Sequence, residues 1–427
     1  MNIFIGAVIL FLVLVTFHEY GHYSVARFFK IKILKFSIGF GPDLFNWKNK
    51  DGVRFSLSAI PLGGYVAFHD PSDVQNYQKL SSKEKEYVLA NRPAIERSLV
   101  TLAGPLFNFI LAFFVFALVG MFMPRESDVA TTKVAELSDS KYYRVLAING
   151  SNIKNAQELE LKLFEQTGYS GQLDIELYDY EAQSEIIFSK TVSNLTFPQD
   201  QSPSSYFSLQ PILDYSPIIS SVEQDSVAYN AGLRDGDLIE KINEDEIFST
   251  LQANDLLNQL DKRLYLEVSR DGEKEFITLP MKREGELYGL SLMPSRNTLY
   301  NSIIYGANQT TFWIANTFKF LIRTFTGSLG LDNLSGPIGI AKVAGDSLSS
   351  GIIPFLLLMA ILSISLGAFN LLPLPMLDGG QFLFILVEEL KGSPISMKLK
   401  AALFNLSYLL IMVLFVFVII NDIGRIL

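Results

Sequence analysis

The stretch IFIGAVILFLVLVTFHEYGHYSVARFF, residues 3–29, decides the fold class of this chain. Its apolar part is long enough for a helix that crosses a membrane, which needs about 20 residues. The same stretch carries His18, Glu19 and His22. Ionisable groups inside a bilayer are costly, and they usually mark a functional site whose partner lies elsewhere in the protein. The rest of the sequence therefore has to supply that partner.

A cleaved signal peptide is the simplest alternative for an apolar run at the N-terminus. No basic residue precedes this run and no small-x-small cleavage site follows it, so we interpret residues 1–29 as a retained transmembrane helix. Residues 98–123, 351–380 and 401–427 contain further apolar windows of spanning length. The sequence thus predicts a polytopic α-helical membrane protein with four transmembrane helices.

Charged residues are distributed unevenly between the connecting segments. Residues 27–97 hold 12 Lys and Arg against 7 Asp and Glu, whereas residues 124–296 hold 16 basic against 30 acidic side chains. Because cytoplasmic loops carry an excess of Lys and Arg, we expect residues 30–97 and 381–400 in the cytoplasm, and the N-terminus and the acidic insert outside. The acidic insert also argues against nucleic acid as a partner. The chain has no cysteine, which excludes disulfides, thiolate nucleophiles and cysteine-bound zinc.

A fifth span at residues 300–325 is the alternative to this four-helix topology. That stretch is fairly apolar, but its polar and charged positions are Asn301, Asn308, Gln309, Asn316, Lys319 and Arg323. Such a mixture is typical of an amphipathic helix at the membrane surface. We therefore interpret residues 296–350 as an amphipathic interfacial region.

The acidic insert contains a recognisable stretch, VAYNAGLRDGDLIEKINEDEI at residues 227–247. Alternating apolar residues bounded by glycine turns predict a small β-rich module. The Gly-Leu-x-x-Gly-Asp turn resembles that of bacterial PDZ domains. Residues 142–163 look like a second copy without this turn, so the sequence suggests two extracytoplasmic PDZ-like α+β domains at residues 125–210 and 211–295. A soluble cap that binds no peptide remains the alternative for the first copy.

The histidines of the first span have the spacing of a metal site. Residues four apart share one helix face, so His18 and His22 can grip one ion with Glu19 beside it. This is the His-Glu-x-x-His arrangement of zinc hydrolases, in which Glu19 would take the proton of a zinc-activated water. A pair of satisfied core histidines is the alternative. It is disfavoured because the chain has only three histidines and two of them lie here, inside an apolar run.

A catalytic zinc needs a third protein ligand, and Asp378 is the candidate. It follows the third apolar window in NLLPLPMLDGG, where Pro373 and Pro375 forbid a regular helix and leave Asn370 free to face a polar site. The alternative is that Asp378 caps the N-terminus of the next helix. We interpret the third histidine, His69, as an ordinary surface residue.

Together these features resemble the site-2 protease family of intramembrane zinc metalloproteases, in particular its Gram-negative members that activate the sigma-E envelope-stress response. The resemblance covers nearly the whole chain. It rests on the two PDZ-like modules and on the stretches HEYGH (18–22), GFGP (39–42), IPLGGYV (60–66), LAGPLFNFILA (102–112), LSGPIGIA (334–341) and NLLPLPMLDGG (370–380).

The resemblance implies a role for each of these site residues. His18, His22 and Asp378 would bind Zn²⁺, Glu19 would be catalytic, and Asn370 would assist catalysis and substrate binding. The chain would lie in the bacterial inner membrane, with its N-terminus and PDZ-like domains in the periplasm and its active site near the cytoplasmic side.

The family also implies regulated intramembrane proteolysis. A single-pass substrate, of the anti-sigma factor type or a signal-peptide remnant, would be cut within its transmembrane segment after its outer domain is removed, with the PDZ-like domains acting as a size filter. By the same resemblance, residues 53–70 form a re-entrant β-loop where substrate adds as an edge strand. Its substrate-binding residues would be Pro61, Gly63, Gly64 and Tyr65. A plain cytoplasmic hairpin is the alternative.

Two competing functions can be stated for the same sequence. One is a non-proteolytic membrane scaffold whose PDZ-like domains bind peptides and whose zinc is structural. Structural zinc has four protein ligands, whereas the sequence offers three good candidates, which favours catalysis. The other is a metal transporter, which would need a polar path across spans that are very apolar here.

Overall fold

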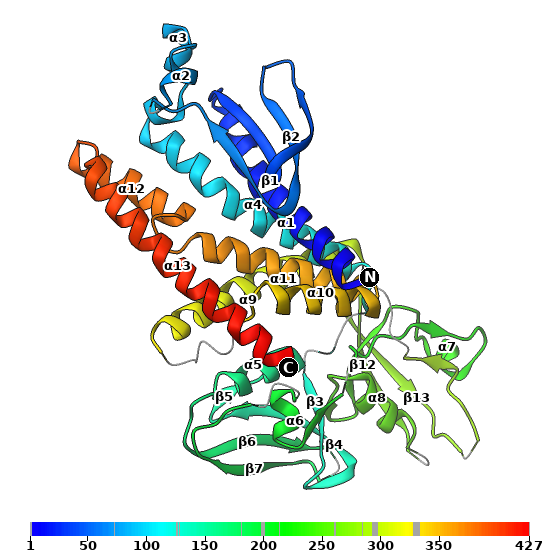
Figure 1. Ribbon diagram of the computed structural model, residues 1–427. Coiled ribbons are helices and arrows are strands. Elements are labelled where there is room, and N and C mark those ends of the chain that lie inside the picture. Colours follow the sequence, from blue (N-terminus) through cyan, green and yellow to red (C-terminus); the bar gives the residue numbers. More distant parts are fainter. Residues whose placement is uncertain are drawn as a thin grey trace. The chain divides into compact units, whose positions relative to one another are not determined.

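The computed structural model describes residues 2–71, 73–124, 127, 129–180, 182–197, 201–212, 214–259, 262–283, 285–292, 298–327 and 334–426. The chain divides into two compact units (Figure 1). The helical unit consists of Met1–Gly120 and Leu299–Leu427, and the insert unit consists of Met121–Thr298.

Four helices among the described residues are long and apolar enough to cross a membrane. They are α1 (Asn2–Phe28), α4 (Ala94–Gly120), α11 (Ile352–Asn370) and α13 (Met397–Ile426). These helices, with the β-sheets of the insert, are those of a polytopic membrane protein with β domains. Helix α11 stops at Asn370, shortly before Pro373 and Pro375, because proline cannot donate the backbone hydrogen bonds that a continuing helix needs.

Small residues allow the first two apolar helices to approach closely. A Cβ added to Gly21 of α1 would lie 2.5 Å from the carbonyl oxygen of Ala103 in α4, so only glycine fits there. Small residues at such contacts let helix backbones pack tightly inside membranes. Figure 1 shows α1 and α4 running side by side. This close contact fixes how α4 is rotated and shifted along α1, and so which residues of the two helices face each other.

Further helices complete the helical unit: α2 (Val74–Tyr77), α3 (Ser82–Lys85), a 3₁₀ turn at Leu89–Asn91, α9 (Leu299–Phe325), α10 (Pro337–Ser350) and α12 (Asp378–Lys391). Helix α9 buries Ser302, Gly306 and Thr310, and its Gly306 packs against Phe113 and Ala117 of α4. This small and polar face lies against α4 near the end of that helix. Within the region predicted to be amphipathic and interfacial, residues 299–325 thus form a helix that packs on α4.

The start of α10 is held by a buried carboxylate from α13. Asp422 is 1% exposed, and its two oxygens accept hydrogen bonds from the backbone N–H groups of Gly336, Ile338 and Gly339 at 2.8–3.0 Å. A negative charge is favourable at a helix N-terminus, where backbone N–H groups have no helical partner. Asp422 therefore ties the last apolar helix to the bundle.

Two long bent strands, β1 (Ile33–Lys48) and β2 (Arg54–Phe68), follow α1 and pair antiparallel with repeated register shifts. Residues 54–57 pair with residues 35–38 on one side, and residues 54–58 pair with residues 43–48 on the other. Residues 64–68 pair with residues 33–38. The hairpin thus forms a small sheet, and residues 64–68 make up one edge of it.

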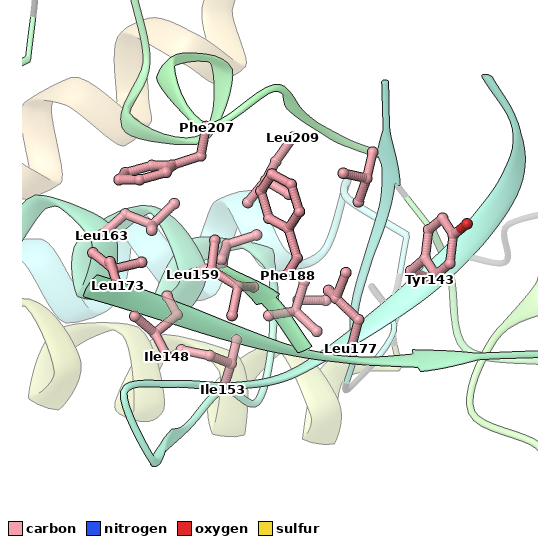
Figure 2. Packing of buried hydrophobic residues seen from close by; sticks show 14 of the residues in the cluster. Tyr143, Ile148, Ile153, Leu159, Leu163, Leu173, Leu177, Phe188, Phe207 and Leu209 are labelled. Carbon is pink, nitrogen blue, oxygen red and sulfur yellow. The ribbon is translucent and has the colours of Figure 1, made fainter. Parts of the chain in front are cut away.

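The first half of the insert unit is a β module with one core, here called the first β module. Its elements are β3 (Ala130–Val134), β4 (Ser138–Ile148), β5 (Ser151–Asn152), α5 (Ala156–Phe164), β6 (Gly171–Asp179), β7 (Ser184–Val192), α6 (Pro203–Tyr206) and β8 (Leu209–Pro211), with sheet order β7-β6-β4-β3-β8. Figure 2 shows Leu159 and Leu163 of α5 packed with Leu173, Leu177 and Phe188 from the sheet. Alternate burial along β6 matches the two-residue period of a strand with one face inward.

The second half, here called the second β module, has its own core. Its elements are β9 (Ser221–Val222), α7 (Val227–Ala231), β10 (Leu238–Ile242), β11 (Asp245–Glu246), α8 (Thr250–Leu257), β12 (Leu264–Arg270), β13 (Glu273–Leu279) and β14 (Leu290–Ser291). The strands form sheets of order β11-β10-β12-β13 and β14-β9. Gly232 ends α7 in the left-handed region at φ 106°, which glycine adopts without steric cost.

A buried ion pair holds the Gly-Leu-x-x-Gly-Asp turn of this module. The carboxylate of Asp237 is fully buried and accepts two hydrogen bonds, both 2.7 Å long, from Nε and Nη2 of Arg270 in β12. Nη2 of Arg270 also donates to the carbonyl of Gly232 at 2.8 Å. This bidentate geometry fixes the turn to the sheet.

We expect Asp237→Ala to lower the local unfolding free energy of the second β module by about 3 kcal/mol. This is the low end of the range for a broken buried pair, because Arg270 keeps 31% of its side chain exposed and can be hydrated. Native-state hydrogen exchange at the amides of β10 and β12 measures the change. The control is Lys274→Ala, an exposed pairing residue that should change the same value by less than about 1 kcal/mol. Wild-type protection in Asp237→Ala would contradict this account of the turn.

Candidate metal centre

The two histidines of α1 lie one helical turn apart and point to the same place. His18 and His22 are both buried, and their rings meet edge to face with centroids 5.0 Å apart. Their Nε2 atoms are 3.4 Å apart. The i and i+4 spacing in the sequence therefore produces the convergence of imidazoles that it predicted.

Asp378, more than three hundred residues further along the chain, reaches the same place from α12. Its Oδ2 lies 3.2 Å from Nε2 of His18 and 3.5 Å from Nε2 of His22. Asp378 is the first residue of α12, and the N-cap is Leu377, so the interpretation of Asp378 as the helix cap is wrong. The carboxylate points to the histidines.

The turn between α11 and α12 is folded back tightly against the start of α12. Added Cβ atoms at Gly379 and Gly380 would overlap the carbonyl groups of Leu371 and Leu374, so these two positions require glycine. Nε2 of Gln381 donates to the carbonyl of Pro375 at 2.7 Å. The close packing at both glycines fixes where α12 begins, and hence where Asp378 lies.

Two observations show that this cluster fits a metal ion. Oδ2 of Asp378 is buried and makes no contact with hydrogen-bond geometry, an arrangement that is costly unless another group pairs with it. A Cβ added to Gly104 of α4 would lie 2.6 Å from Cε1 of His22 and 2.8 Å from Cε1 of His18, so α4 leaves room for the rings only because residue 104 is glycine. Imidazole nitrogens and a carboxylate oxygen within 4.8 Å of one another are the ligands that zinc prefers.

Glu19 lies beside this cluster, where α1 meets the edge of the β1–β2 sheet. It accepts a hydrogen bond from the backbone of Val66. A Cβ added to Gly64 would lie 2.7 Å from the carbonyl oxygen of Ser37 and 3.3 Å from Cγ of Glu19, so residue 64 packs closely beside this side chain and has no room for a larger residue. Glu19 and the three candidate ligands line one cavity of about 600 Å³ in the helical unit.

The same cavity contains other residues that the sequence singled out, together with one that it did not. Asn370, the last residue of α11, and Tyr65 of β2 both line it. So does His69, which is partly buried, with its Nδ1 inaccessible and without a hydrogen-bond partner. Burial, and next the charge of Lys32, lower the pKa of His69 and so favour its neutral ring. The interpretation of His69 as an ordinary surface residue is wrong.

The remaining residues predicted in the β-loop lie at the bend of β2. Gly63 has φ of 125° and packs against the ring of Phe40, which leaves no space for a side chain. Tyr65 stacks on Phe40 with ring centroids 6.3 Å apart, and the ammonium of Lys35 lies 5.2 Å from the Tyr65 ring. Pro61 is part of β2, but its side chain lies outside the described residues.

Helix α4 contributes three positions that the sequence analysis missed. The carbonyl of Val100 accepts a hydrogen bond from Nδ1 of His22 at 2.8 Å, Gly104 faces both rings, and Asn108 contacts Nδ1 of His18 at 3.2 Å. These positions are four residues apart and so share one helix face. The spacing alone shows a shared helix face, and only the packing of α4 against α1 shows that this face meets the histidines.

A cluster of two buried histidines and one partly buried aspartate, with an adjacent glutamate, among apolar helices defines a membrane metallohydrolase. The sequence matches Peptidase family M50 over residues 6–414, and the chain belongs to this family of peptidases. The resemblance to site-2 proteases is therefore confirmed.

Curated relatives cover almost the full length of the chain. The "Regulator of sigma E protease" of Haemophilus influenzae is 32% identical over 97% of this chain and 96% of its own. The "Putative zinc metalloprotease PM1991" of Pasteurella multocida is 32% identical over 99% and 98%, and the "Regulator of sigma-E protease RseP" of Escherichia coli is 28% identical over 97% and 96%.

Proposed function

We propose that the protein is an intramembrane zinc protease that hydrolyses a peptide bond within the transmembrane segment of single-pass substrates. The observation that carries the proposal is the convergence of His18, His22 and Asp378 beside Glu19, inside a bundle of apolar helices. Hydrolysis of a peptide bond is the chemistry of the family, and the position of His18, Glu19 and His22 within the apolar helix α1 supports a reaction at membrane depth.

His18, His22 and Asp378 would hold the zinc ion, which leaves a coordination position open for catalysis. When bound, zinc supplies Lewis-acid chemistry: it polarises the scissile carbonyl and makes a water molecule more acidic. Glu19 takes the proton from the attacking water and returns it to the nitrogen of the leaving amine. Asn370, at the wall of the cavity, positions the scissile peptide group.

The substrate would bind as an extended strand along residues 64–68. Among the described residues, no strand pairs with the outer edge of this segment, and Val66 of the segment contacts Glu19. An unpaired edge can receive a peptide by β-augmentation, which also unwinds a substrate helix and exposes its carbonyl groups. Gly63, Gly64 and Tyr65, together with Pro61, would shape this binding edge.

The β1–β2 hairpin would dip into the membrane as a re-entrant loop. Leu44 is 70% exposed, Phe45 is 63% exposed and Trp47 is 49% exposed, all on the strand that lies furthest from residues 64–68. Exposed apolar side chains in such a cluster are typical of a surface that meets lipid or another protein. A lipid environment would satisfy them and place the binding edge at the depth of the substrate.

The two β modules would be PDZ-like domains that face the periplasm and admit only substrates whose outer domain has been removed. The glycine turn of the second β module, with its buried Asp237, supports the PDZ-like assignment for that copy. The excess of Lys and Arg in residues 27–97 supports a cytoplasmic position for that segment, with the active site near the cytoplasmic side of a bacterial inner membrane.

The physiological substrate class would be anti-sigma factors or related single-pass proteins, including signal-peptide remnants. The names of the relatives from Haemophilus influenzae and Escherichia coli support a role in sigma-E regulation and envelope stress. A scaffold with structural zinc is less consistent with the site, because the cluster among the described residues offers three ligands and a structural zinc needs four.

Removal of zinc tests the proposal. Purified protein in lipid nanodiscs should cut a panel of single-pass membrane proteins, and mass spectrometry should place the new termini inside the transmembrane segment. Chelation should lower the cleavage rate to background, and added Zn²⁺ should restore it, because zinc supplies the Lewis acid that polarises the scissile carbonyl. Undiminished cleavage after the zinc content has fallen to zero, or cuts only outside the membrane segment, would refute the proposal.

A further inference from the structure

Asn108 lies in the middle of the apolar helix α4, and the proposed reaction assigns no role to its buried side-chain amide. It is fully buried in α4, and its Nδ2 lies 3.2 Å from Nδ1 of His18. Its backbone carbonyl accepts a hydrogen bond from Oγ of Ser363 in α11 at 2.8 Å. A polar side chain in such surroundings is costly unless a specific interaction requires it.

The two histidines must present the same ring nitrogen to a metal. Both Nε2 atoms converge on Asp378, so in each ring the proton must be on Nδ1. Each Nδ1–H group then needs a hydrogen-bond acceptor on another residue. His22 meets this requirement, because its Nδ1 contacts the carbonyl of Val100, which can only accept. His18 needs an acceptor in the same role, and Asn108 is the group in contact with its Nδ1.

The amide of Asn108 can supply that acceptor. Its nitrogen and oxygen occupy equivalent positions, and the hydrogen-bond network decides which of them faces a partner. Oδ1 in its present place is buried and has no donor within reach. Turning the amide by half a turn brings Oδ1 to Nδ1 of His18, where Oδ1 accepts a hydrogen bond from the Nδ1–H group.

We infer that Asn108 is a positioning residue: its Oδ1 accepts a hydrogen bond from Nδ1 of His18, fixes the tautomer of that ring and keeps Nε2 free for zinc. The inference rests on the proposed zinc site. Partners of this kind orient metal-bound histidines, and their removal typically weakens metal binding by about 10–100-fold. Val100 and Asn108 lie eight residues apart on one face of α4. The carbonyl of Val100 then accepts the hydrogen bond of His22, and the side chain of Asn108 accepts that of His18.

Zinc affinity in the purified full-length protein tests this role, measured by competition with a fluorescent chelator. Asn108→Leu keeps the approximate volume and removes the acceptor, so zinc affinity should fall about 10–100-fold. Asn108→Asp keeps an acceptor and should restore affinity to within about tenfold of wild type. The matched control is Ser363→Ala, which removes the neighbouring hydrogen bond to Asn108 without touching His18 and should leave affinity unchanged.

A spectroscopic measurement separates positioning from packing. With Co²⁺ in place of zinc, the visible spectrum should change in Asn108→Leu and resemble wild type in Asn108→Asp, because the spectrum reports the ligand geometry. Asn108→Asp decides the matter even if the leucine variant does not fold: wild-type-like affinity supports the inference, and a folded aspartate variant without metal overturns it. Wild-type affinity in Asn108→Leu also overturns it. Absence of zinc from the wild-type protein would instead refute the proposed function.

Discussion

Glu19→Gln should abolish cleavage while the protein keeps its zinc. The carboxylate lies beside the three candidate ligands in one cavity and is not needed to complete them. Glutamine has nearly the same shape but cannot take a proton from the attacking water. General acid–base groups contribute about 10²–10⁴-fold to rate, so we expect the cleavage rate to fall by that factor with little change in substrate affinity. Single-turnover cleavage in nanodiscs, with zinc content measured on the same sample, checks both parts.

Two further variants sharpen this test. Glu19→Asp keeps the carboxylate on a shorter side chain and should retain partial activity. Glu86→Gln makes the same chemical change at an exposed residue of the segment after β2, and should cleave like wild type. Cleavage by Glu19→Gln at the rate of Glu86→Gln would eliminate Glu19 as the general base. Loss of zinc from Glu19→Gln would show instead that Glu19 helps to hold the metal.

The sequence predicted the parts of the site that local patterns encode. The apolar runs predicted four spans, and the spacing of His18 and His22 predicted convergent imidazoles because the helical period is fixed. Asp378 was predicted from the proline-rich break after the third span. The end of α11 at Asn370 follows from the same prolines.

The parts contributed by α4 could not be predicted in this way. Val100, Gly104 and Asn108 matter because of how α4 is rotated and shifted against α1, and no local pattern determines that register. The close contact at Gly21 sets it, through packing between residues far apart in the sequence. His69 was missed for a related reason, since its place at the cavity depends on how the chain after β2 returns to the bundle.

Gly104→Ala should remove zinc from the protein, although alanine favours a helix more than glycine does. The new Cβ would overlap Nε2 of His22 and lie 2.8 Å from Cε1 of His18, so at least one ring must leave the cluster. Loss of a ligand is more severe than loss of a group that orients one, so zinc affinity should fall by more than about 100-fold and cleavage should stop. The apo protein should not be destabilised by helix propensity, because alanine is better than glycine there by about 1 kcal/mol.

Gly120→Ala is the matched control, because it makes the same change on the same helix. Its Cβ would meet the ring of Tyr305 at 2.9 Å, a flexible side chain remote from the histidines, so zinc affinity should stay at the wild-type value. Metal content and chelator competition on both variants measure the difference. Equal zinc affinity in Gly104→Ala and Gly120→Ala would mean that His22 can move away without cost. The site would then not depend on the close packing of α4 against the two rings.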